Sequence, residues 1–147
     1  MPVFLSACYE DDSCSQNTDT GINVTVTNEG DDFTTVESWK FTALDDTTAL
    51  VSSDNLSYTA GIPLDMNDTV VELLFSVRAS DTLDYVSDTV IIHYVQTDLS
   101  LLSVNCGFAP TYNITELVHT INILDSVLIY EQEVSTDLVS DNAAFYY

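Results

Sequence analysis

Positive charge is almost missing from this 147-residue sequence, which has 24 Asp and Glu residues but only Lys40 and Arg78 as cations. The net charge of −22 is scattered along the chain rather than gathered in a tail. Such a protein repels phosphate backbones and anionic membranes, so we expect no nucleic-acid partner. Lipid attachment, cations, neutral glycans and basic proteins remain compatible partners. Acidity of this kind is typical of an adaptation to solubility or salt, with a binding role as the alternative.

Long apolar runs are also missing, since no stretch reaches the 18 or so residues that a membrane-spanning helix needs. The 46% of hydrophobic residues are instead spread along the chain, which argues against disorder. A chain of this length forms one domain with a single core. Helical spacing and glycine-rich loops are absent too.

Alternation of apolar and polar residues is the dominant pattern, and it starts at Ile22, Val24 and Val26. Turn-forming clusters such as Asp65-Met66-Asn67-Asp68 separate the later runs. The spacing predicts an all-β fold, an antiparallel β-sandwich or small barrel. The runs at 70–77 and 90–95 are apolar on both faces, which favours central positions, whereas the acidic run 126–134 is typical of an edge strand. We expect further strands at 33–44, 48–52, 55–59, 69–78, 88–96, 99–104, 111–115, 118–124, 126–134 and 142–147.

The front of the chain contains a candidate lipid anchor. Leu5-Ser6-Ala7-Cys8 resembles a bacterial lipobox, in which an apolar residue and two small residues precede the cysteine that is acylated. This predicts that residues 1–7 are the remnant of a lipoprotein signal peptide, 8–20 a flexible acidic tether and 21–147 a single β domain. More than one acyl chain would anchor the protein firmly. The alternative is that Val3–Ala7 is a first strand and Cys8 an ordinary buried thiol.

Three cysteines are an odd number for an exported protein. If Cys8 carries lipid, Cys14 and Cys106 remain as an even pair, and we expect them to form a disulfide. Closing so long a loop would stabilise the fold by about 4–5 kcal/mol on the chain-entropy model. Two unpaired buried cysteines are the alternative.

Motifs for catalysis or for metal binding are not recognisable. The acidic clusters at 65–68 and 81–84 do not fit a calcium loop, and His93 and His119 lack the companions of a zinc site. A Gly-x-Ser-x-Gly elbow and a phosphate-binding loop are also missing. We therefore expect no enzyme activity, cofactor or metal. A hydrolase whose site is invisible in the sequence, built around either histidine, is the alternative.

Five Asp-Thr or Asp-Ser steps precede a β-branched or aliphatic residue. They look like the O-glycosylation signal of exported Bacteroidota proteins, whereas the chemistry of a turn leading into a strand would produce the same triplets. The candidate glycosylation sites are Thr47, Thr69, Thr82, Thr89 and Ser126.

Five short segments occur in an order and spacing that run nearly end to end: Cys8 to Cys14, Ile62 to Asp65, Ser103 to Phe108, Ile123 to Val127 and Asp141 to Tyr147. Together they resemble a family of short Bacteroidota lipoproteins of unknown function. The resemblance implies export by the lipoprotein route, residence at the outer membrane, a disulfide between Cys14 and Cys106, and no known activity. The sequence departs from the family pattern in its truncated signal peptide and its near absence of lysine and arginine.

These features predict a non-catalytic accessory or binding subunit at the outer membrane, anchored through Cys8 and facing a protein partner or a glycan. An exposed pair of coplanar aromatic rings would favour a glycan. The alternative is a structural surface protein that assembles by strand addition, with the 142–147 strand or the tether as donor. The aromatic candidates are Trp39, Tyr58, Tyr85, Tyr94, Tyr112, Tyr130, Tyr146 and Tyr147.

Overall fold

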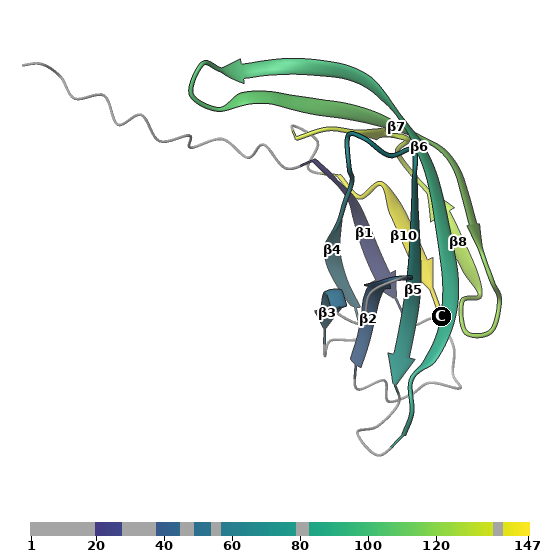
Figure 1. Ribbon diagram of the computed structural model, residues 1–147. Helices are drawn as coiled ribbons and strands as arrows, with labels where there is room; N and C mark the ends of the chain where they lie inside the picture. The colour runs from purple at the N-terminus through teal and green to yellow at the C-terminus, as the bar shows by residue number, and fades with distance from the viewer. Residues whose placement is uncertain (1–19, 28–37, 45–48, 54–56, 79–82, 137–139) are drawn as a thin grey trace, which may run out of the picture.

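The computed structural model describes residues 20–27, 38–44, 49–53, 57–78, 83–136 and 140–147. These residues form ten strands and no helix, in two sheets that face each other across a common core (Figure 1). The prediction of an all-β fold is therefore confirmed. The described part of the chain therefore has no helix that is long and apolar enough to cross a membrane. The proposed signal remnant and nearly all of the tether lie outside the described residues.

The smaller sheet has four strands in the order β4-β1-β10-β8. β1 pairs with β4 in antiparallel fashion but with β10 in parallel, so the expected antiparallel arrangement holds with one exception. The parallel pair joins two segments from opposite ends of the described chain, and β10 is therefore enclosed between β1 and β8. The strands are β1 (Gly21–Thr27), β4 (Ser57–Pro63), β8 (Ser126–Ile129) and β10 (Ala143–Tyr146).

The larger sheet has six antiparallel strands in the order β3-β2-β5-β6-β7-β9, curled into a half-barrel. The runs predicted to be central lie in β5 and β6, which is confirmed. The run 126–134 is split into β8 and β9, and each of these is an edge strand of its sheet. The strands are β2 (Ser38–Ala43), β3 (Ala49–Ser53), β5 (Val70–Arg78), β6 (Val86–Ser103), β7 (Gly107–His119) and β9 (Glu133–Val134).

The core lies between the sheets and follows from the two-residue period of the strands. In β1 the side chains of Ile22, Val24 and Val26 are fully buried while their neighbours are half exposed. Aromatic rings fill the centre, where Phe41 contacts Phe145 of the opposite sheet at a centroid distance of 5.2 Å. Edge-to-face contacts of this kind stabilise beyond the area they bury.

The predicted strand at 118–124 is wrong over its second half, because residues 120–125 form a turn. The buried carboxylate of Asp88 on β6 holds this turn by accepting hydrogen bonds from the amides of Asn122, Ile123 and Leu124. The hydroxyl of Thr120 donates a fourth. A single distant residue thus ends β7 and directs the chain towards β8 in the other sheet.

The runs 88–96 and 99–104, predicted to be two strands, are one strand of 18 residues, β6. It pairs with β7 from Val90 to Ser103, with register shifts after His93, Gln96 and Leu101. The two strands are joined by the turn 104–106 and by Gly107, whose φ of +75° lies in the left-handed region that favours glycine. The far half of this hairpin projects beyond the rest of the molecule (Figure 1).

Candidate functional site

We call the projecting half of the hairpin, residues 95–111, the arm. It curves over the ends of β1 and β4 (Figure 1). A cleft of about 1110 Å³ lies between the arm and the strands below it. The cleft is lined by Thr20, Gly21, Asn23, Ala43, Leu50, Gly61, Pro63, Leu64, Asp65, Met66, Cys106, Phe108, Pro110, Tyr112, Ser135 and Thr136.

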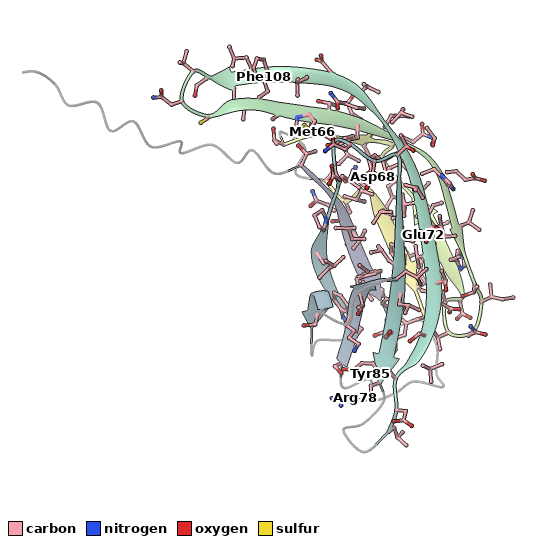
Figure 2. The ribbon with its side chains drawn as sticks, viewed as in Figure 1. Met66, Asp68, Glu72, Arg78, Tyr85 and Phe108 are labelled. Carbon is pink, nitrogen blue, oxygen red and sulfur yellow. The ribbon has the colours of Figure 1, made fainter. Side chains whose placement is uncertain are left out.

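The roof of the cleft is the apolar underside of the arm. Phe108 and Pro110 line the cleft, and their cross-strand partners on β6 are Leu101 and Leu99. Directly paired residues share a face of an antiparallel ribbon, so all four side chains lie on the same face. Phe108 remains 58% exposed and Leu101 57% exposed. Figure 2 shows Phe108 on the arm, with Met66 on the body of the molecule below it.

The floor of the cleft comes from the outer face of β1 and β4, where the lining includes the glycines Gly21 and Gly61. A Cβ atom built on Gly61 would meet nothing within 4 Å, so this position opens into free space. A Cβ atom on Gly21 would lie 2.8 Å from the carbonyl oxygen of Ile62. Gly21 is therefore required by its packing, whereas Gly61 has room for a side chain.

The root of the arm is fixed to the floor by hydrogen bonds. The hydroxyl of Thr20 donates to the carbonyl oxygen of Pro110 at 2.9 Å, which joins the start of the described chain to β7. The hydroxyl of Tyr94 donates to the carbonyl oxygen of Asp65 at 3.0 Å, and the carboxylate of Asp65 accepts the amide of Asn67. The 65–68 cluster is therefore a turn, as its sequence chemistry predicts.

The hydroxyl of Tyr112 is buried beside the cleft and has no hydrogen-bond partner among the described residues. Its ring stands edge-on to Tyr94 at 5.4 Å. Burial raises the pKa of Tyr112 above its ordinary value of 10.0, and the neighbouring Tyr94 and Asp65 add to this effect. The hydroxyl therefore stays protonated and is a potential donor to a ligand that reaches it.

The lining of the cleft is chemically mixed. It combines apolar side chains with amides, hydroxyls and one carboxylate, the mixture that an extended polypeptide presents to a groove. The described residues contain no group of three His, Cys, Asp or Glu side chains that could hold a metal ion.

Of the predicted anchor and disulfide residues, the structure describes only Cys106. It lies in the turn at the tip of the arm and lines the cleft, and its amide donates to the hydroxyl of Ser103 at 3.0 Å. Cys8 and Cys14 lie outside the described residues. The lipid anchor and the Cys14–Cys106 disulfide stay predictions.

The candidate glycosylation sites lie in unlike places. Thr69 is exposed in the turn before β5, Thr89 is half-buried within β6 and Ser126 is half-buried at the start of β8. Thr47 and Thr82 lie outside the described residues. Glycosylation also stays a prediction.

Neither histidine lies at the cleft. Nε2 of His93 is 4.0 Å from Oε2 of Glu116 on the neighbouring strand, and Nδ1 of His119 is 2.8 Å from the carbonyl oxygen of Thr120. Trp39, Tyr94, Tyr112 and Tyr147 are core residues rather than a surface platform.

The cations gather at the end of the molecule opposite the arm. Nζ of Lys40 lies 4.2 Å, and Cζ of Arg78 5.0 Å, from the ring centroid of Tyr85. Figure 2 shows Arg78 and Tyr85 far from Phe108. The cleft therefore has no cation in its lining, and it suits a neutral or positively charged ligand.

Sequence reasoning missed the cleft, although one signal was present. Residues 95–111 contain only one charged residue, Asp98, in a chain with 24 acidic residues. Depletion of charge together with exposed apolar side chains is typical of surfaces that become buried on binding.

The fold and the site define an all-β protein with a hairpin arm over a cleft. Within that class, the chain belongs to the family of unknown function DUF6452, which matches residues 38–147 and so includes the arm. Comparisons with curated proteins and with solved structures find no significant match.

Proposed function

We propose that this protein is a non-catalytic binding subunit of the bacterial cell envelope, which holds an extended segment of a partner protein in the cleft beneath the arm. The observation that carries the proposal is the cleft of about 1110 Å³ with the exposed Phe108 in its roof. Attachment to the outer membrane of a member of the Bacteroidota through a lipid on Cys8 is part of the proposal. The lipobox-like sequence and the resemblance to lipoproteins support it.

A protein partner fits the cleft better than a glycan does. Sugar rings stack on exposed, flat aromatic surfaces, whereas the ring pairs Trp39–Phe41, Phe41–Phe75, Phe75–Phe145 and Tyr94–Tyr112 lie in the core at tilted or edge-on angles. The exposed Phe108 lies on the arm as a single ring over an apolar lining. Such a lining suits alternating side chains of an extended chain.

The two alternatives receive less support from the arrangement of residues. A donor strand at 142–147 would have to leave its place between β1 and β8, where the side chain of Phe145 is fully buried. The hydrolase alternative was built around a histidine, but neither His93 nor His119 lines the cleft.

Photo-cross-linking in the native membrane tests the proposal. A photoreactive phenylalanine analogue at position 108 should cross-link one partner protein, whereas the analogue at Leu83, which is exposed but outside the cleft, should not. Gly61→Trp should abolish the cross-link by filling the cleft, and Gly61→Ala should keep it. A cross-link that survives Gly61→Trp, or none at position 108, would contradict the proposal. Intact mass of the protein from the same membranes tests the lipid on Cys8 separately.

A further inference from the structure

Among the strands that the structure describes, none pairs with the outer edge of β6 along the arm. β5 pairs with β6 only as far as His93, and the amide of Tyr94 then donates to the carbonyl oxygen of Thr69. From Val95 to Ser103 no other described strand lies against this edge, while β7 occupies the opposite one. An unpaired edge presents free amide and carbonyl groups, which can hydrogen-bond to another extended chain.

The outer edge of β7, in contrast, is protected. Pro110 has no amide hydrogen, and its carbonyl oxygen accepts the hydroxyl of Thr20. β9 pairs with the next part of the strand at Tyr112 and Asn113. A proline in an edge strand and a neighbouring segment that covers the edge are two ways in which proteins prevent strand addition. The arm therefore has one closed edge and one open edge.

The open edge has few of these protections. Between Val95 and Ser103 there is no proline and no lysine, and Asp98 is the only charged residue. The register shifts after Gln96 and Leu101 leave Asp98–Leu101 as a regular stretch. Within it the amide of Leu99 donates to the carboxylate of Asp98 at 2.8 Å and so is not used in the ladder with β7. A carbonyl group of an added strand could replace that carboxylate.

Charge selects the occupant of this edge. A second copy of the chain would also carry a net charge of −22, and its acidic tether would face the carboxylate of Asp98. A strand with Lys or Arg would pair with that carboxylate once it is displaced from the amide of Leu99. Alternating apolar residues would extend the face formed by Leu99, Leu101 and Phe108.

We propose that the edge of β6 at residues 95–103 accepts an extended, positively charged segment of another protein by β-strand addition. This goes beyond the cleft binding proposed above, because it concerns a second surface. The backbone groups involved lie on the edge of β6 that faces away from β7. It concerns the chemical class of the partner and the backbone groups that bind it.

A nine-residue peptide, Lys-Lys-Val-Thr-Val-Thr-Val-Lys-Lys, and a twin that is N-methylated at alternate residues test the proposal by titration calorimetry. The twin keeps the charge but cannot form a ladder. Leu99→Pro removes the amide of residue 99, which points away from β7. It should leave the pairing with β7 intact, because Leu99 lies opposite Pro110 and its amide does not donate to β7. Leu99→Ala is the matched control. Asp98→Lys reverses the edge charge and serves if Leu99→Pro does not fold.

The unmodified peptide should bind wild type and Leu99→Ala with affinities within about threefold of each other. The N-methylated twin, Leu99→Pro and Asp98→Lys should each weaken binding at least about tenfold, the effect of losing one or two net hydrogen bonds or a charge pair. No binding to wild type, or equal binding of the twin, would overturn the proposal. So would self-association of the protein alone that Leu99→Pro abolishes, since a second copy would then be the occupant. Loss of peptide binding in Gly61→Trp but not in Leu99→Pro would place the peptide in the cleft, which overturns strand addition and leaves the proposed function standing.

Discussion

The substitution Asp88→Asn tests how the chain passes from the larger sheet to the smaller one. The side chain of Asp88 is 1% exposed and accepts four hydrogen bonds. Three come from the amides of Asn122, Ile123 and Leu124 at 2.7–2.8 Å and one from the hydroxyl of Thr120. All four donors belong to the turn between β7 and β8.

The expected loss of stability follows from this geometry. A hydrogen bond to a charged group contributes about 1.5–3 kcal/mol. Asparagine has one acceptor oxygen, which can take two of the four hydrogen bonds, and its NH₂ group would face two donors. Asp88→Asn should therefore lower the free energy of unfolding by about 3–6 kcal/mol, a large part of the 5–15 kcal/mol typical of a domain.

Urea denaturation followed by the fluorescence of Trp39 measures this loss, because Trp39 is the single tryptophan and is fully buried. The matched control is Asp84→Asn, which makes the same change of charge at an exposed position. It should alter stability by less than about 0.5 kcal/mol. If Asp88→Asn costs no more than the control, the turn is not held by this carboxylate.

The pH dependence gives a second measurement. Burial raises the pKa of Asp88, but the hydrogen bonds from Thr120 and the three amides outweigh this and lower the pKa below its ordinary value of 3.8. Because the pKa is lower in the folded state, the carboxylate stabilises fully above pH 3.8 and this stabilisation is lost as the pH falls through the folded-state pKa. The difference in the free energy of unfolding between wild type and Asp88→Asn should therefore shrink as the pH falls below about 3.8. If this difference in the free energy of unfolding does not change with pH, the charge of Asp88 does not hold the turn.

Three further predictions concern packing, buried hydroxyls and charge. Gly21→Ala should destabilise by about 1–3 kcal/mol because its Cβ atom meets the backbone of Ile62, whereas Gly61→Ala should be neutral or stabilising; equal urea midpoints would contradict this. Tyr112→Phe and Tyr147→Phe each remove a buried hydroxyl without a described partner and should stabilise by about 1 kcal/mol, measured by the same denaturation. Only Tyr112→Phe should also change cross-linking from position 108, since Tyr147 does not line the cleft. Finally, raising the ionic strength from about 0.01 M to 0.15 M should increase the melting temperature, because shortening the Debye length from about 30 to 8 Å screens the repulsion within a chain of charge −22; a melting temperature that falls would refute this.

Local periodicity was enough to predict much of the fold. The alternation at Ile22, Val24 and Val26 correctly assigned a half-buried strand with these residues in the core. The runs in β5 and β6 were correctly expected at the centre of a sheet, since strands with apolar residues on both faces need neighbours on both sides. These features depend on neighbouring residues only and can therefore be read from the sequence.

The candidate site could not be predicted in the same way. Its floor comes from β1 and β4 and its roof from β7, so it exists only because the arm curves back over the smaller sheet. The absence of charge at residues 95–111 was visible, but it did not indicate which surface would lie opposite. The same limit applies to Asp88, which in sequence resembles any turn residue before a strand.

By itself, the sequence determined the all-β class, the acidity that limits the choice of partners, and the positions of the main core residues. Each depends on composition or on the two-residue period of a strand, which act over short distances along the chain. The tertiary structure alone decided that β10 lies parallel to β1 and that Asp88 holds the turn after β7. It also decided that the arm covers a cleft and that the outer edge of β6 has no described partner along the arm. These features arise from contacts between residues 30 to 120 positions apart, as between Asp88 and Leu124 or Asn23 and Asn142. Such contacts are selected by the packing of the whole chain, for which no short segment of sequence carries the information.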